Sequence, residues 1–271
     1  MLATDPGPLF LIAGSGDYPA LVLAGARQAG VERIILAAFE GETNPALADL
    51  ADDVHWMKVG QMGRLLKAAT ASGATRSLMA GQIAPSHLFD LRPDWKALVI
   101  LATLPERNAE SLFGAVADEL SRAGVPLLPA TTFMDSHIAP AGPITGGKPK
   151  PRLLADLEFG LRIAKETSRL DIGQTVVVKN GTVLAVEAFE GTNEAIRRGG
   201  ALGRGGATLV KVSKPGQDMR FDVPVIGTKT LETAAAAGIR CIGVEAARTL
   251  LLNQPLVRER ATQLGLAIYG L

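Results

Sequence analysis

Short apolar runs alternate with segments of helical period through residues 1–135, and this alternation constrains the fold more than any other feature. LFLIA (9–13) and RIILAAF (33–39) read as buried strands, and the helix-compatible run ALVLAGARQAG lies between them. Further strand and helix signals follow in the same order, up to VPLLPAT (125–131). Strands separated by helices of this length form βαβ units around a parallel sheet. We therefore predict an α/β fold whose N-terminal domain, residues 1–135, is Rossmann-like with a parallel sheet.

Proline and glycine interrupt this pattern in SHIAPAGPITGGKPKP (136–151), which predicts a linker or long loop. A second α/β domain is expected over residues 152–271. It begins with a long helix and continues with TVVVKNGTVLAVEAFEG. Asn180-Gly181, placed between two β-branched runs, is a strong hairpin signal, so this domain has an antiparallel element and a different topology.

Composition excludes several classes of protein. The 28 basic and 27 acidic residues leave a net charge of +1, and aromatic residues are only 4%, so nucleic acid is not an expected partner. The single cysteine, Cys241, lies in the apolar run IRCIGVEA and predicts a buried thiol in a reducing compartment. The apolar stretch Ala97 to Leu104 is far shorter than the roughly 20 residues of a spanning helix. We expect a soluble, cytoplasmic protein.

The first candidate site is GSGDYP, which directly follows the first strand. Gly14 and Gly16 permit a tight turn, and the start of the next helix offers free N–H groups to an anion. Glu40, at the end of the second strand, stands where a dinucleotide-binding fold holds a ribose hydroxyl. Pro19 replaces the third glycine of the dinucleotide fingerprint. The stretch therefore fits a nucleotide or phosphate contact and an ordinary βα turn about equally well.

The second candidate site is AFEGTNEAIRRGG (188–200). A strand is expected to end at Glu190-Gly191, and Thr192 can cap the helix that follows. Arg197 and Arg198 on the next turns could bind an anion at this helix start. Taken alone, the pattern fits a capped surface helix with solvated arginines better.

The third candidate site, KPGQDMRFD (214–222), is the most specific. If the chain is extended after the Pro-Gly turn, Asp218, Arg220 and Asp222 alternate onto one face. A row of carboxylate, guanidinium and carboxylate suits phosphate binding and water activation. A self-neutralising ion-pair network is the alternative. Asp222, however, stands between Phe221 and VPVIG, which is an unusual setting for a solvated carboxylate.

Motifs of other enzyme classes are missing from the sequence. The three histidines are scattered and form neither H-E-x-x-H nor a Cys/His cluster, which argues against zinc. Ser15 lacks the full G-x-S-x-G elbow of α/β-hydrolases, and the Walker motif G-x-x-x-x-G-K-[ST] does not occur.

Three motifs in order, GSGDYP, EAFEGTNEAIRRGG and KxxKPxQDxRFDxPxxG, resemble the LpxI-type UDP-2,3-diacylglucosamine pyrophosphatases of lipid A biosynthesis. The likeness spans nearly the whole chain, and its last two motifs are the most specific. It implies hydrolysis of UDP-2,3-diacylglucosamine to UMP and 2,3-diacylglucosamine 1-phosphate (lipid X), by attack of water on the α-phosphorus. It also implies a two-domain layout with the active site between the domains, and assistance by Mg²⁺ or Mn²⁺.

The resemblance assigns roles to individual residues by motif position. It makes Asp222 the catalytic residue, and Asp218, Asp222 and Glu190 the candidate metal ligands. Residues from all three motifs would contact the substrate: Gly14, Ser15, Gly16, Tyr18, Glu190, Gly191, Thr192, Lys214, Gln217, Asp218 and Arg220.

The expected partner is a lipid-linked nucleotide sugar, reached through transient contact with a membrane surface. Peripheral attachment to the inner face of the inner membrane and a homodimer are left open. Two other functions are also left open: a nucleotide-dependent oxidoreductase built on the GSGDYP turn, and a non-catalytic module that binds a nucleotide sugar or a lipid.

Overall fold

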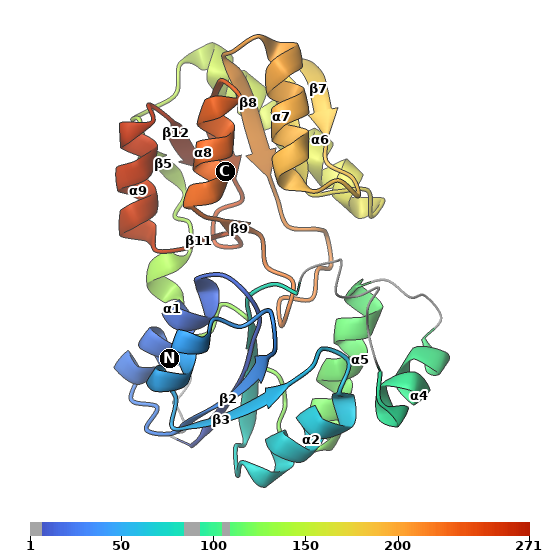
Figure 1. The fold of residues 1–271 in the computed structure, drawn as a ribbon. Helices are drawn as coiled ribbons and strands as arrows, with labels where there is room; N and C mark the ends of the chain where they lie inside the picture. The colour runs from blue at the N-terminus through green and yellow to red at the C-terminus, as the bar shows by residue number, and fades with distance from the viewer. Residues whose placement is uncertain (1–6, 84–92, 105–108) are drawn as a thin grey trace. The chain divides into compact units, whose positions relative to one another are not determined.

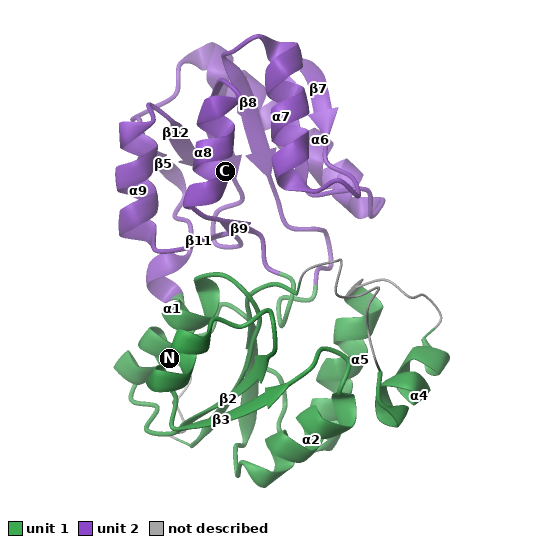
Figure 2. Cartoon of the chain, in the orientation of Figure 1, with its two compact units in different colours: residues 1–134, 218–222 green, residues 135–217, 223–271 purple. Residues whose placement is uncertain are grey.

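The computed structural model describes residues 7–83, 93–104 and 109–271, and these form two compact units. Unit 1 comprises residues 1–134 together with 218–222, and unit 2 comprises residues 135–217 together with 223–271. Figure 1 labels the elements along the chain, and Figure 2 colours unit 1 green and unit 2 purple. A short segment from the C-terminal half of the sequence therefore belongs to the N-terminal unit.

Unit 1 is built around a parallel sheet in the strand order β3-β2-β1-β4. This confirms the predicted parallel sheet. VPLLPAT was expected to add a strand, but only an isolated bridge between Ser77 and Leu127 forms there. The elements in chain order are β1 (Leu9–Ala13), α1 (Tyr18–Gln28), β2 (Ile34–Phe39), η1 (Pro45–Leu50), β3 (Asp53–Met57), α2 (Met62–Ala71), β4 (Arg76–Ala80), α4 (Trp95–Thr103) and α5 (Ala109–Arg122).

The two central strands of unit 1, β1 and β2, are buried on both faces, which is why they read as continuous apolar runs rather than alternating ones. Along β1, Phe10 and Ile12 belong to the cluster that packs against α2 and α5. Leu9 and Leu11 point to the opposite face and are also fully buried. Because β1 and β4 are paired in parallel, their carboxyl ends lie side by side and the loops that follow them can meet.

Unit 2 contains a mixed six-stranded sheet in the order β5-β12-β10-β8-β6-β7 and a small parallel pair of β9 with β11. The predicted hairpin forms, with Asn180 and Gly181 at positive φ between β6 and β7. The elements in chain order are η2 (Asp135–His137), β5 (Gly142–Thr145), α6 (Pro151–Arg169), β6 (Thr175–Lys179), β7 (Thr182–Val186), α7 (Thr192–Gly203), β8 (Ala207–Lys211), β9 (Val225–Ile226), α8 (Thr228–Ala236), β10 (Ile239–Val244), β11 (Leu250–Leu251), α9 (Gln254–Gln263) and β12 (Ala267–Gly270).

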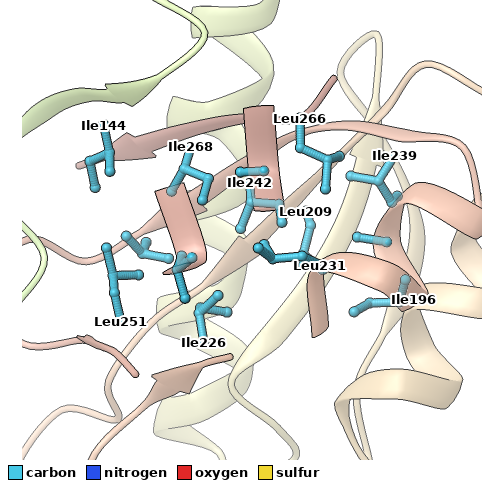
Figure 3. Packing of buried hydrophobic residues seen from close by; sticks show 14 of the residues in the cluster. Ile144, Ile196, Leu209, Ile226, Leu231, Ile239, Ile242, Leu251, Leu266 and Ile268 are labelled. Carbon is cyan, nitrogen blue, oxygen red and sulfur yellow. The ribbon is translucent and has the colours of Figure 1, made fainter. Parts of the chain in front are cut away.

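Helices cover both faces of this sheet. On one face α6 packs so closely that a Cβ on Gly160 would lie 2.6 Å from a methyl group of Val210. On the other face a Cβ on Gly199 of α7 would lie 2.5 Å from Val177. The latter face carries the larger cluster of aliphatic side chains, which Figure 3 shows, with Leu209 and Ile242 among its labelled residues.

The boundary between the units lies at Met134, close to the start of the expected linker. Residues 136–151 are more ordered than a linker, because Gly142–Thr145 form β5 and pair with β12 in the second sheet. A boundary drawn from composition alone also missed the excursion of residues 218–222 into unit 1.

Cys241 is fully buried in β10, as expected, and burial raises the pKa of its thiol to about 12. No helix within the described ranges is both long enough and apolar enough to cross a membrane.

Candidate active site

The GSGDYP turn is joined to the loop after β4 by backbone contacts. The amide N–H of Ser15 and its hydroxyl both donate to the carbonyl oxygen of Gln82, each at 2.8 Å. A Cβ on Gly14 would lie 2.4 Å from that same oxygen. The structure thus needs glycine at position 14 to let two loops approach. Gly16, in contrast, is exposed at φ +87°, where a turn requires glycine and nothing crowds it.

Tyr18 is buried, and its hydroxyl donates to the carbonyl oxygen of Ala130. Burial raises the pKa of this phenol well above its usual range. The amide of Ala130 in turn donates to the carbonyl oxygen of Met219 at 2.7 Å. The Tyr18 hydroxyl therefore supports the backbone on which the 218–222 segment rests.

The 218–222 segment is a turn, not an extended chain. The amides of Phe221 and Asp222 both donate to the carbonyl oxygen of Asp218, at 3.3 and 3.0 Å. The expected alternation of Asp218, Arg220 and Asp222 on one strand face is therefore wrong. In a single helical turn, residues four apart are neighbours, so Asp218 and Asp222 are still brought to one side of the backbone.

Asp218 and Arg220 form a close ion pair within this turn. Arg220 Nη2 lies 2.7 Å from Asp218 Oδ2, and Arg220 Nε lies 3.0 Å from Oδ1. The Arg220 amide donates a further hydrogen bond to Oδ1 at 3.0 Å. Hydrogen bonds from Arg220 hold the pKa of Asp218 below its usual range, despite partial burial. Both carboxylate oxygens of Asp218 are thus already engaged.

A cavity of about 670 Å³ lies in unit 1 and reaches the same segment. Its polar lining comes from the loops after β1 and β4 and from the start of α1 and α2: Ser15, Tyr18, Gln61 and Gln82. Its walls are mainly apolar and include Ile12, Phe39, Leu65, Met79, Ile100, Phe113, Val116 and Phe221. The rings of Phe113 and Phe221 lie 5.8 Å apart, so the residue before Asp222 forms part of the cavity wall.

In unit 2, Thr192 is at the centre of a polar cluster. It is the first residue of α7, and Gly191, at φ +82°, occupies the cap position that we expected for Thr192. Its hydroxyl donates to Glu187 Oε1 at 2.7 Å and accepts from Lys211 Nζ at 3.2 Å. Sequence reasoning assigned no role to Glu187 or Lys211, although Lys211 is the first residue of the KxxKPxQDxRFD motif.

Glu190 is exposed and lies 2.5 Å from Arg198 through its Oε1. Hydrogen bonds to the nearby backbone and to Arg198 keep the pKa of Glu190 below its usual value. Arg197 pairs in the same way with Glu194. Both arginines of this motif are therefore paired with carboxylates, whereas the surface-helix interpretation expected solvated arginines.

Lys214 and Gln217 lie at the end of the unit 2 chain that leads directly into Asp218. Gln217 Oε1 accepts from the Lys214 amide at 2.7 Å, while Lys214 Nζ lies 2.9 Å from Asp171. Gln217 is buried, and its Nε2 has no hydrogen-bond partner in the described part of the chain. A buried amide donor without an acceptor is costly, so the Gln217 Nε2 group has an unused capacity to donate a hydrogen bond.

The start of this segment is anchored by Glu245, which sequence reasoning also missed. Its Oε2 accepts from Lys165 Nζ at 2.6 Å and from both the amide and the hydroxyl of Ser213, at 2.9 and 2.7 Å. Lys165 also donates to the Ser213 carbonyl at 2.9 Å. The residue before Lys214 is thereby fixed through three of its polar groups.

Metal ligands were expected at Asp218, Asp222 and Glu190. Within the described ranges, no three acidic, histidine or cysteine side chains lie close enough together to hold an ion. Asp218 fits the role poorly, because both of its oxygens accept hydrogen bonds from Arg220. Asp218 and Asp222 belong to unit 1 and Glu190 to unit 2.

The fold and the site define an α/β protein of two units, with an apolar cavity and a carboxylate-bearing turn in unit 1 and a network of lysine, glutamine and threonine side chains in unit 2. Comparison with known protein families shows which family within this class the chain matches. Residues 8–137 match the LpxI N-terminal domain, and residues 140–269 match the LpxI C-terminal domain.

The chain belongs to the LpxI family. It is also 34% identical over 278 aligned residues to a protein of Caulobacter vibrioides called UDP-2,3-diacylglucosamine pyrophosphatase LpxI. The match covers 97% of this chain and 96% of that protein.

Proposed function

We propose that this chain hydrolyses the pyrophosphate bond of UDP-2,3-diacylglucosamine, releasing UMP and 2,3-diacylglucosamine 1-phosphate. The name of the Caulobacter relative supports this substrate and reaction. The parallel sheet and the GSGDYP turn support a Rossmann-like unit that contacts the nucleotide. A soluble cytoplasmic enzyme with a lipid-linked substrate fits the family.

The observation that carries the proposal is the cavity in unit 1. Its volume of about 670 Å³ is within the range of small-molecule sites, and its apolar walls suit acyl chains. Phe221 belongs to this wall, and the next residue in the chain is Asp222. One short turn thus carries both Phe221, in the wall of a cavity suited to acyl chains, and Asp222, the candidate catalytic carboxylate. A diacylated phosphate substrate requires both features close together.

In the proposed reaction the oxygen of a water molecule bonds to the α-phosphorus, and the bond from that phosphorus to the bridging oxygen breaks. The leaving group departs as 2,3-diacylglucosamine 1-phosphate. Asp222 accepts the proton of the attacking water, because Asp218 is engaged by Arg220 and is a poor base.

Other groups bind the charged part of the substrate. Lys214 contributes a cation and Gln217 a buried amide donor, immediately before the turn in the chain. Lys211, whose Nζ also donates to the Thr192 hydroxyl, provides a second cation in unit 2. Electrostatic groups set in advance toward developing phosphoryl charge are a major source of catalysis.

We also propose that Mg²⁺ or Mn²⁺ assists. When bound, such an ion would neutralise charge on the phosphoryl oxygens. The described side chains do not assemble a complete ligand set, so we assign no step of the reaction to the ion.

The test is hydrolysis of UDP-2,3-diacylglucosamine in ¹⁸O-labelled water, with both products analysed by mass spectrometry. We expect the label in UMP, which places the attack on the α-phosphorus. Label in the lipid phosphate would redirect the attack to the other phosphorus. Absence of UMP, or binding of NAD(P) by the purified protein, would reject the hydrolase in favour of the binding module or the oxidoreductase.

A further inference from the structure

The helix α4 is apolar on two opposite faces. Its sequence, WKALVILAT, contains one charged residue, Lys96. Ala97, Ile100 and Leu101 are spaced as neighbours on one face and line the cavity. Trp95, Leu98 and Val99 share the other face and are 79%, 46% and 43% exposed. A short helix with both faces apolar is normally buried, so the exposed face needs an explanation.

This exposed face is the main apolar feature on the described surface of unit 1. The only other large hydrophobic side chain exposed in the described part of that unit is Leu50. Scattered single apolar residues are normal on a protein surface, but three on one face of a nine-residue helix form a patch. Tryptophan at the start of such a patch is typical of elements that lie at a membrane interface.

The helix is held firmly in place by polar contacts at its start. Asp94 Oδ1 accepts from the Ala97 amide at 2.9 Å, and its Oδ2 accepts from the Gly63 amide of α2 at 2.7 Å. Lys96 lies 2.7 Å from Glu119 of α5. These contacts fix which face of α4 points away from α2 and α5, so the exposure of Trp95 is not the result of a loosely attached helix.

The neighbouring helix adds positive charge. α2 packs against α4, contains no acidic residue, and exposes Arg64 and Lys67. Exposed basic residues on a helix that packs against an apolar helix favour a surface that is both apolar and anionic. The cytoplasmic side of a bilayer containing anionic lipids has this combination.

We propose that α4 is the element through which this chain contacts a lipid bilayer, with Trp95, Leu98 and Val99 inserted at the interface. The proposal rests on the proposed function, because the opposite face of the same helix lines the cavity assigned to the acyl chains. An acyl chain leaving the bilayer beside α4 would pass from one face of the helix to the other.

Sedimentation with vesicles tests the proposal independently of activity. The variant is W95S/L98S/V99S, and the matched control, L50S/L202S/L256S, removes three exposed leucines from separate elements. On vesicles of phosphatidylethanolamine and phosphatidylglycerol we expect the variant to bind at least about tenfold more weakly than the wild type and the control. Equal binding by variant and wild type, or no binding by the wild type, would overturn the proposal.

A second measurement reports the position of Trp95 directly. Trp56 is the other tryptophan, so in a W56F background the emission comes from Trp95 alone. Insertion predicts a blue shift on vesicle addition and quenching by brominated acyl chains. An unchanged emission spectrum would overturn the proposal. A wild-type homodimer that W95S/L98S/V99S dissociates would also overturn it, because the patch would then be a contact between two copies of the chain.

The two hypotheses fail in different ways. Hydrolysis of detergent-dispersed substrate by W95S/L98S/V99S should stay within about twofold of wild type, because the changed residues are exposed surface positions. Hydrolysis of substrate embedded in vesicles should fall with binding. A wild type that binds vesicles but hydrolyses neither preparation would reject the proposed function and leave the membrane contact standing. If the wild type bound neutral phosphatidylcholine vesicles as tightly as anionic ones, Arg64 and Lys67 would have no part in the membrane contact.

Discussion

Arg220 donates hydrogen bonds to both carboxylate oxygens of Asp218, from Nη2 to Oδ2 at 2.7 Å and from Nε to Oδ1 at 3.0 Å. Because charge-assisted bonds of this kind favour the ionised form, Asp218 is a weak proton acceptor. The family motif by itself places two aspartates in this turn. The ion pair supplies a physical reason to assign water activation to Asp222 rather than to Asp218.

The same ion pair predicts an acid-sensitive stability. The folded-state pKa of Asp218 lies below its unfolded value, so its contribution is present above the unfolded pKa of about 3.9 and is lost as pH falls through the lower folded value. We expect Asp218→Asn to reduce stability near neutral pH and to flatten the loss at acid pH. Thermal unfolding from about pH 6 to pH 3 measures this. The exposed Asp49→Asn control should keep the wild-type profile.

Asp222→Asn should lower kcat by about 10² to 10⁴, since it removes a general base while nearly preserving side-chain shape. Unfolding stability and substrate binding should remain close to wild type. Steady-state release of UMP and binding of UDP-2,3-diacylglucosamine provide the two readouts. Activity within a few-fold of wild type would contradict the assignment of Asp222.

Removal of divalent ions should suppress hydrolysis, and Mg²⁺ or Mn²⁺ should restore it. Equilibrium dialysis with Mn²⁺ gives a readout that does not depend on turnover. If Asp222 ligates the ion, Asp222→Asn should bind Mn²⁺ more weakly, while Asp218→Asn should change binding little, because Arg220 occupies its oxygens. Full activity in metal-free protein would remove the ion from the reaction.

Local patterns in the sequence predicted much of the fold. The parallel sheet of unit 1 follows from apolar runs separated by helical ones, and the β6–β7 hairpin follows from Asn180-Gly181. α4 escaped prediction because its residues are apolar in every direction, so they show no helical period. β5 escaped because its Gly-Pro start reads as a loop, and only pairing with β12 makes it a strand.

The sequence motifs contain several residues of the candidate site but do not predict its geometry. The motifs contain Asp218, Arg220 and Asp222, yet the turn that holds them also packs through Phe221 against Phe113, about a hundred residues away in the chain. Thr192 was expected as a helix cap by its residue type. Its hydroxyl instead joins Glu187 and Lys211, which come from separate parts of the sheet. The contacts of Phe221 with Phe113 and of Thr192 with Lys211 join residues that are distant in the sequence, so they leave no local signal.

Tyr18→Phe tests the support beneath the catalytic turn. The change removes the donor to the buried carbonyl of Ala130, which should cost about 1–3 kcal/mol of unfolding free energy. Because the Ala130 amide holds Met219, we also expect a lower kcat with little change in KM. Denaturant unfolding and steady-state kinetics measure both. Tyr269→Phe, whose hydroxyl makes no hydrogen bond within the described chain, should change neither.

Glu245 and Lys165 together fix Ser213, the residue directly before Lys214 in the chain segment that leads to Asp218. Burial tends to raise the pKa of Glu245, but hydrogen bonds from Lys165 and Ser213 lower it overall, so its stabilising charge is present at neutral pH. Glu245→Gln or Lys165→Met alone should destabilise the fold by about 1–3 kcal/mol. The double variant should lose less than the sum, since neither partner is then left uncompensated. Denaturant unfolding of the four proteins measures the coupling.

The exposed pair of Glu232 with Arg260, 3.0 Å apart, should couple by less than about 1 kcal/mol. Additive losses at Glu245 and Lys165 would show that the two residues do not act as one anchor.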